Sequence, residues 1–98
     1  MPLFALIGHD GPEGPELRKL HRESHLANLA PLDAYGRVVH AGPLLGDTGQ
    51  PIGSLVLFEA PNLADARAFA AGDPYVVQGV FERWEVRETR VVFPKPRG

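Results

Sequence analysis

Apolar residues recur with different spacings along the chain, and each spacing predicts one type of secondary structure. Residues 3–7 form a continuous apolar run that ends at Gly8, which is typical of a strand buried on both faces. From Pro15 to Ala30, apolar residues recur near the helical spacing of three to four positions. Pro31 predicts a kink or the end of regular helix near Ala30, because proline lacks an amide hydrogen and clashes with the preceding turn.

The second half of the chain repeats this alternation of strand and helix. Residues 37–41 and 54–59 have the composition of strands, and the segment 42–53 between them is rich in Gly and Pro, which predicts a long hairpin loop. Asn62 is expected to cap a second helix that ends at Gly72. Residues 80–89 then alternate in polarity and predict the last strand, with one face formed by Val80, Trp84 and Val86 and the other by Phe81, Arg83, Glu85 and Arg87.

The resulting order, βαββαβ, predicts an α+β fold in which a four-stranded antiparallel sheet carries both helices on one face. The first and third strands are apolar at consecutive positions, so both faces of the sheet centre are expected to avoid water. Because two helices cover only one face, we expect a second copy of the chain to cover the other, as in dimeric α/β barrels. The alternative is ordinary exposed apolar surface. At 98 residues, the chain 1–98 is expected to be a single domain with residues 90–98 as a tail.

Composition excludes several classes of function. The chain has 10 basic and 12 acidic residues, and its basic side chains are scattered, which argues against a nucleic-acid partner. It has no cysteine, which rules out disulfides, thiolate catalysis and cysteine-based zinc sites. No apolar run approaches the roughly 20 residues of a membrane span, and no signal-peptide pattern is visible, so we expect a cytoplasmic protein without a membrane partner. No phosphate-binding or dinucleotide-binding motif occurs, and no cofactor is expected.

Asp73 carries the most informative chemistry, because it follows a helical segment and precedes Pro74. Its carboxylate suits the N-cap of a helical turn that begins at Pro74, and it also suits acid–base chemistry with a histidine. Topology by itself favours His9 or His21 as its partner. His25 lies ten residues beyond Pro15, roughly 15 Å along the helix axis, and reaches Asp73 only if the site opens partway along the sheet.

His21 and His25 are four residues apart, a spacing that can bind zinc. The glutamate between them does not follow the first histidine directly, so the metalloprotease motif is absent. Two ligands are also too few for a zinc site unless His9, Asp10 or Asp73 supplies a third, and no metal is expected.

Three motifs occur in a fixed order: Arg22-Glu23-Ser24-His25-Leu26, then a strand that runs into Gly42-Pro43, then Asp73-Pro74-Tyr75. In this order the chain resembles the YCII-related (YciI-like) family over roughly residues 3–86. The resemblance implies a ferredoxin-like protomer, a homodimer, and a site in which His25 and Asp73 cooperate. The residue types and positions add candidate substrate-binding residues, namely His9, Gly42, Pro43 and Tyr75. The alternatives are a strand-ending turn at Gly42-Pro43 and a core or dimer contact at Tyr75.

The leading hypothesis is an enzyme that uses His25 and Asp73 for acid–base work on a small organic substrate, as an isomerase, a lyase or a hydrolytic dehalogenase. The alternative is a noncatalytic dimeric module for ligand binding or accessory interaction, in which the same pair only organises structure. RNA binding by the sheet is disfavoured, because the strands lack exposed aromatic and basic residues.

Overall fold

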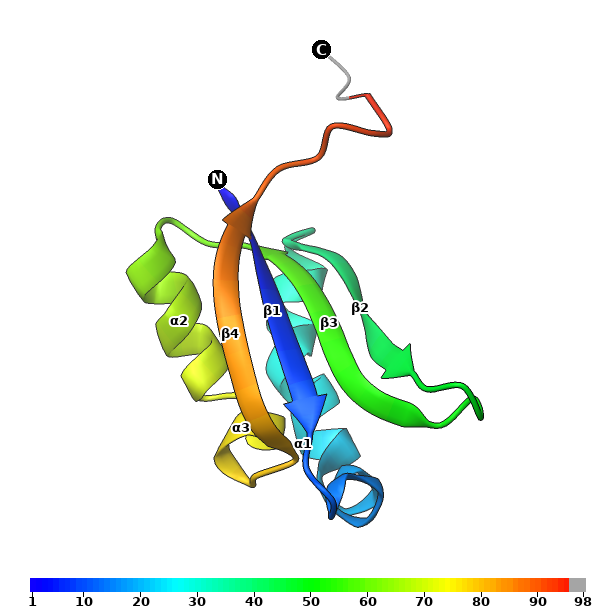
Figure 1. Ribbon diagram of the computed structural model, residues 1–98. Helices are drawn as coiled ribbons and strands as arrows, with labels where there is room; N and C mark the ends of the chain where they lie inside the picture. Colours follow the sequence, from blue (N-terminus) through cyan, green and yellow to red (C-terminus); the bar gives the residue numbers. More distant parts are fainter. Residues whose placement is uncertain (96–98) are drawn as a thin grey trace.

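The computed structural model describes residues 1–95 and has the predicted βαββαβ order with one additional short helix (Figure 1). The four strands form an antiparallel sheet in the order β2-β3-β1-β4. The predicted α+β, ferredoxin-like fold is confirmed. Its elements are β1 (Leu3–Asp10), α1 (Gly14–Ala34), β2 (Val38–Leu45), β3 (Pro51–Glu59), α2 (Leu63–Ala71), α3 (Pro74–Val77) and β4 (Phe81–Thr89).

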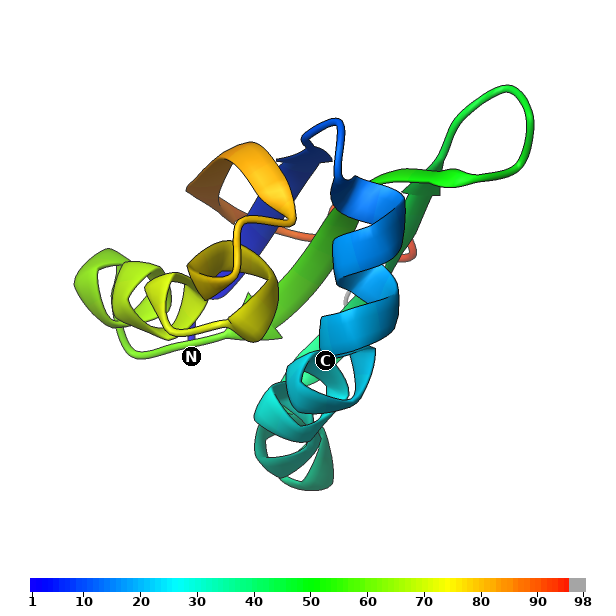
Figure 2. The ribbon, with the colours of Figure 1, turned by 90° about the horizontal axis from the view of Figure 1, so that it is seen from below.

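The helices lie on one side of the sheet, as predicted (Figure 2). The core between the two layers centres on β1 and β3, and α2 packs through Ala66 and Ala70, both fully buried. Asn62 caps α2 as expected, because its Oδ1 accepts a hydrogen bond from the Asp65 amide at 2.8 Å. The core residues are Phe4, Leu6, Leu29, Val56, Phe58, Ala60, Ala66, Ala70 and Val86.

Helix α1 is longer than the sequence predicts. It continues to Ala34, past Pro31, so of the two effects expected of Pro31 the end of regular helix near Ala30 is wrong. Proline lacks the amide hydrogen of one intrahelical hydrogen bond. Because Pro31 is close to the end of α1, few intrahelical hydrogen bonds follow it, and the helix tolerates the loss. Beyond its end at Ala34, Gly36 has a φ of +69°, which lets the next amide, of Arg37, donate back to the Leu32 carbonyl at 2.9 Å.

The β2–β3 hairpin is also longer than predicted. The expected loop over residues 42–53 is wrong, since β2 extends to Leu45, β3 begins at Pro51, and the turn contains only residues 46–50. Two prolines made the ends of these strands resemble loop residues in the sequence. Pro43 is tolerated because β2 lies at the edge of the sheet, and Pro51 because it is the first residue of its strand.

In β4, the predicted faces are wrong at one end because of a β-bulge. Opposite β1, His9 pairs with Arg83 but Asp10 pairs with Phe81, so Glu82 is an extra residue. The bulge returns Phe81 to the buried side, where it is only 5% exposed. Residues 90–95 of the predicted tail have no helix or strand, and the rest of that tail lies outside the described residues.

The face of the sheet without helices is apolar at its centre and charged along β4. Alternate residues of β1 and β3 point to it, among them Ile7, Leu55 and Leu57, which are each partly exposed. On β4 the same face carries alternating charges. In the described part of the chain, no helix is both long enough and apolar enough to cross a membrane.

Candidate functional site

Asp73 lies between α2 and α3, where it is the N-cap residue of α3. Its Oδ1 accepts a hydrogen bond from the Tyr75 amide at 2.8 Å, and Pro74 occupies the first turn, where no amide hydrogen is needed. The predicted capping role is therefore confirmed. The Asp73 side chain is fully buried, and the cap holds its carboxylate toward α1.

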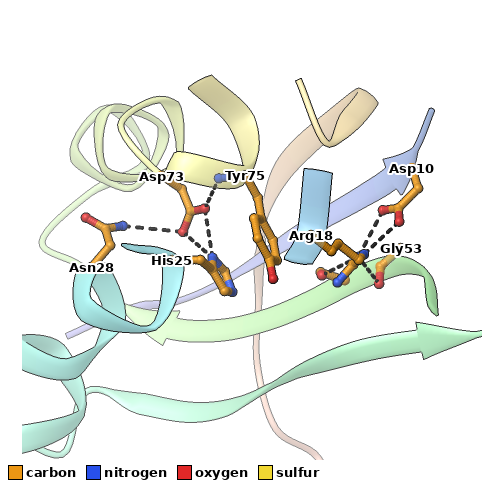
Figure 3. Close-up of polar contacts among 8 residues, drawn as sticks. Asp10, Arg18, His25, Asn28, Gly53, Asp73 and Tyr75 are labelled. Atoms are coloured by element: carbon orange, nitrogen blue, oxygen red, sulfur yellow. Dashed lines mark hydrogen bonds and ion pairs between the residues drawn. The ribbon is translucent and has the colours of Figure 1, made fainter. Parts of the chain in front are cut away.

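His25 of α1 contacts Asp73 directly (Figure 3). Its Nδ1 lies 2.8 Å from Oδ1 and 2.9 Å from Oδ2 of the carboxylate, and Asn28 donates to Oδ2 at 3.3 Å. An ionised carboxylate only accepts hydrogen bonds, so Nδ1 donates to it, and whenever the ring is neutral Nε2 carries the lone pair. The structure thus joins the pair that the family resemblance selected. The contact lies partway along α1, where α3 packs against that helix.

Tyr75 connects this pair to a second cluster of charges. Its ring stacks on the His25 ring with centroids 4.0 Å apart and an interplanar angle of 5°. On the other side, the Arg18 guanidinium carbon lies 5.1 Å from the Tyr75 ring centroid. Burial raises the pKa of the Tyr75 hydroxyl above its ordinary value of 10.0, against the opposing charges of Arg18 and Arg22. The phenol therefore stays protonated near neutral pH.

Arg18 and Asp10 form an ion pair that the sequence analysis missed. Arg18 Nε donates to Asp10 Oδ2 at 2.7 Å, and Nη2 donates to Oδ1 at 2.9 Å (Figure 3). Nη2 also contacts the Gly53 carbonyl oxygen at 2.7 Å and Ser54 Oγ at 2.9 Å. Gly14 makes room for this pair, because a Cβ there would lie 2.7 Å from Asp10 Oδ2. The sequence contained one indication that Arg18 belongs to the site, because Arg18 and His25 are seven residues apart and share a helix face.

A pocket of about 240 Å³ opens beside the side chains of Arg18, Tyr75 and His25, between α1 and the strands β2 and β3. Three of the four predicted substrate-binding residues line it, namely Gly42, Pro43 and Tyr75, together with His25. Its complete lining is Arg18, Lys19, Arg22, His25, Gly42, Pro43, Pro51, Ser54 and Tyr75.

The fourth predicted binding residue, His9, does not line this pocket. Alternation along β1 sends Asp10 toward α1, and it therefore sends His9 to the opposite face, where it lies between Gly53 and Arg83. His21 is also absent from the lining. Within residues 1–95, no group of three potential metal-ligating side chains is close enough together to hold an ion.

The match to known proteins covers nearly the whole chain. The model of the YCII-related domain matches residues 2–90. The chain belongs to the YCII-related family. Two relatives match over nearly their whole length. Protein YciI from Escherichia coli O6:H1 is 36% identical over 97 residues, covering 93% of this chain and 99% of its own. A protein from Haemophilus influenzae is 36% identical over 96 residues, covering 92% of this chain and 98% of its own.

Among solved structures, this YCII-related chain is similar to 5-chloro-2-hydroxyhydroquinone dehydrochlorinase from Burkholderia phenoliruptrix, in complex with 2,5-dihydroxybenzoquinone. The TM-score is 0.79 and the identity is 29%, with 90% of this chain and 93% of the other covered. A NIPSNAP family protein from Agrobacterium tumefaciens, with a TM-score of 0.56 and 22% identity over 97% of both chains, shares the fold.

Proposed function

We propose that this chain is an acid–base enzyme that needs no cofactor and acts on a small organic substrate. His25 transfers the proton, and Asp73 positions His25. The observation that carries the proposal is the contact of His25 Nδ1 with both carboxylate oxygens of a fully buried Asp73. This contact fixes the ring and its tautomer, and it leaves Nε2 as the nitrogen available to a ligand in the pocket.

We propose one reaction step that suits this geometry. Nε2 of His25 takes a proton from a saturated substrate carbon next to the carbon that bears the leaving group, and the electron pair of the broken C–H bond becomes a new π bond. The leaving group departs with the electron pair of its own bond. Asp73 stabilises the imidazolium that forms, and the ring then returns its proton to the leaving group or to solvent.

A lyase-type elimination is the favoured reaction among the isomerase, lyase and hydrolytic dehalogenase types. The support is the dehydrochlorinase, which is 29% identical to this chain and covers 90% of it. Loss of hydrogen chloride from an organic ring needs a positioned base and a pocket of about ring size. The base of this chain and its pocket of about 240 Å³ match those needs.

A noncatalytic ligand-binding or accessory module is the alternative, and one observation favours it. Asp73 caps α3 with the same Oδ1 that contacts His25, so the pair could serve structure alone. In that case ligands would bind unchanged, and substitution of His25 would alter stability or affinity without altering any turnover.

The test is a turnover screen with a matched histidine control. Small halogenated and hydroxylated ring compounds, beginning with 5-chloro-2-hydroxyhydroquinone, are incubated with the protein, and halide release and loss of substrate are measured. We expect His25→Ala to lower turnover by roughly 100-fold or more. His21→Ala, one helical turn earlier and outside the pocket, should leave it near the unsubstituted level. Equal turnover in both variants would refute the assignment.

A homodimer is part of the proposal, with the helix-free face of each sheet packed against the other. It is supported by the partly exposed apolar residues at the centre of that face. Light scattering should give twice the chain mass of 10.6 kDa. Leu57→Lys on this face should yield monomers, whereas Leu20→Lys, at an exposed position of α1, should not. Monomers in the unsubstituted protein would contradict the dimer.

A further inference from the structure

The pocket beside His25 is strongly asymmetric in charge. Helix α1 contributes three cationic side chains to it, Arg18, Lys19 and Arg22. Among the described residues that line the pocket, none is acidic. Asp10 and Asp73 lie behind the lining, each already bound to a side chain of α1.

The three cations differ in how far they are already engaged. Arg18 donates to Asp10, to the Gly53 carbonyl and to Ser54, which fixes it in place. Lys19 and Arg22 form no salt bridge with any of the residues 1–95. Their charges are therefore available to a ligand.

Arg22 has the more informative position of these two. Residues 18, 22 and 25 follow the helical spacing of four and three positions, so Arg22 lies on the same helix face as Arg18 and His25 and between them. Its charge acts on the Tyr75 hydroxyl, because Arg22 opposes the rise in the pKa of that group. A ligand oxygen bound by Arg22 would thus lie close to His25.

The opposite wall of the pocket has a different character. It is formed by Gly42 and Pro43 of β2 and by Pro51 and Ser54 of β3. The two prolines offer no amide hydrogen and present a flat apolar surface. The volume of about 240 Å³ falls below the range of about 300–1,000 Å³ typical for drug-sized ligands. These dimensions suit a molecule with a single ring.

We infer that the pocket binds a small planar organic anion, with its acidic oxygen against Arg22 and Lys19 and a ring carbon facing Nε2 of His25. This inference rests on the proposed function and names the substrate class of that same site. The arrangement also suits the chemistry. When His25 removes a proton from a saturated ring carbon next to a carbonyl group, negative charge moves onto the carbonyl oxygen, and a cation already placed there stabilises that charge.

The experiment compares an anion with a neutral analogue of the same shape. 3-Hydroxybenzoate and 3-hydroxybenzamide are titrated separately into ¹⁵N-labelled protein near neutral pH, and affinities are taken from amide shifts in α1. The anion should bind roughly 10-fold or more tightly than the amide, as expected for charge-assisted hydrogen bonds. Arg22→Gln should remove most of that preference, and Lys19→Gln part of it. Arg67→Gln, at an exposed position of α2, is the matched control and should retain it.

Equal affinities for the two compounds, the absence of shifts with the anion at millimolar concentration, or an unchanged preference in Arg22→Gln would each overturn the inference. The outcome is separable from that of the proposed function. His25→Ala should still bind the anion, because Arg22 and Lys19 remain. Anion selectivity without any His25-dependent turnover would leave the binding inference standing and remove the catalytic proposal. Turnover that depends on His25 but not on Arg22 would support the catalytic proposal and remove the binding inference.

Discussion

Two carboxylates hold two side chains of the same helix face, and they hold them for different purposes (Figure 3). Asp10 binds Arg18 through two parallel hydrogen bonds of 2.7 and 2.9 Å. Asp73 binds His25 through one nitrogen that contacts both carboxylate oxygens, at 2.8 and 2.9 Å. Both pairs are largely buried. The difference lies in the side chain that each carboxylate binds rather than in the carboxylate.

A guanidinium keeps its charge at every relevant pH, whereas an imidazole gains and loses a proton near neutrality. Arg18 also donates to Gly53 and Ser54, so it links β1, β3 and α1. His25 contacts only Asp73 through hydrogen bonds in the described part of the chain, and its second nitrogen is unused. We therefore expect the first pair to determine stability and the second to determine chemistry.

The largest expected effect is on stability, and it tests the architectural role of the first pair. Asp10→Ala leaves Arg18 unpaired while its side chain is only 12% exposed. Breaking a buried pair in this way costs about 3 kcal/mol of unfolding free energy. Urea denaturation measures the loss.

The control for that substitution is Glu23→Ala, at an exposed position of α1, which should change stability by no more than about 0.5 kcal/mol. A second variant, Asp10→Ala with Arg18→Met, should regain part of the loss because the unpaired charge is gone. If Asp10→Ala were no more destabilising than Glu23→Ala, the architectural role would be lost.

The next effect is on turnover, and it separates chemistry from capping at Asp73. Asn caps helices about as well as Asp, so Asp73→Asn should keep α3 in place. Its amide can donate to Nδ1 of His25, however, which favours the other tautomer and places the proton on Nε2. We expect turnover to fall by roughly 100-fold. Asp73→Ala should cost about 1 kcal/mol more stability than Asp73→Asn, because the cap is also lost.

Kinetics and urea unfolding of the two Asp73 variants measure this difference. Under our account the variants share a large loss of turnover but differ in stability. Turnover that declined only in proportion to stability would show that the Asp73–His25 pair is structural. Both pairs would then have the same role, and the contrast between them would be lost.

The smallest effect concerns Tyr75, which lies between the two pairs. Its pKa is raised by burial, so the folded protein keeps the proton after the unfolded chain begins to lose it near pH 10. This contribution to stability is present below that pH and is lost as the pH rises toward the pKa of the folded state. The stability of Tyr75→Phe should therefore fall less steeply above about pH 10 than that of the unsubstituted protein.

Urea midpoints measured on both sides of pH 10 test this prediction, with Tyr35→Phe as the control because Tyr35 is 80% exposed. Parallel pH profiles for Tyr75→Phe and the unsubstituted protein would show that the phenol does not titrate differently on folding.

The sequence predicts the order of elements well, because that order depends on local periodicity. It fails where a long-range pairing overrides a local signal. Pro43 and Pro51 look like loop residues, but the edge of the sheet and a strand start accommodate them. Phe81 looks like a residue of the outer face until the bulge opposite β1 turns it inward.

The candidate site shows the same limit. The pair of His25 and Asp73 is predicted from a resemblance, while topology alone favours His9 or His21. The short helix α3 explains how His25 reaches Asp73 despite its position far along α1. It places Asp73 against the middle of α1. The Asp10–Arg18 pair was missed because it joins a strand end to a helix, and no periodic pattern connects the two.

The central claim is that Asp73 holds His25 with the proton on Nδ1 and the lone pair on Nε2, ready to accept a proton from a substrate. Long-range ¹H–¹⁵N NMR of the histidine rings measures this tautomer directly, and His25→Gln assigns the signals. We predict a protonated Nδ1 and an unprotonated Nε2 in the neutral ring, with the tautomer changed in Asp73→Asn. A proton on Nε2 in the unsubstituted protein, with Nδ1 bare, would contradict the account, because no base would then face the pocket.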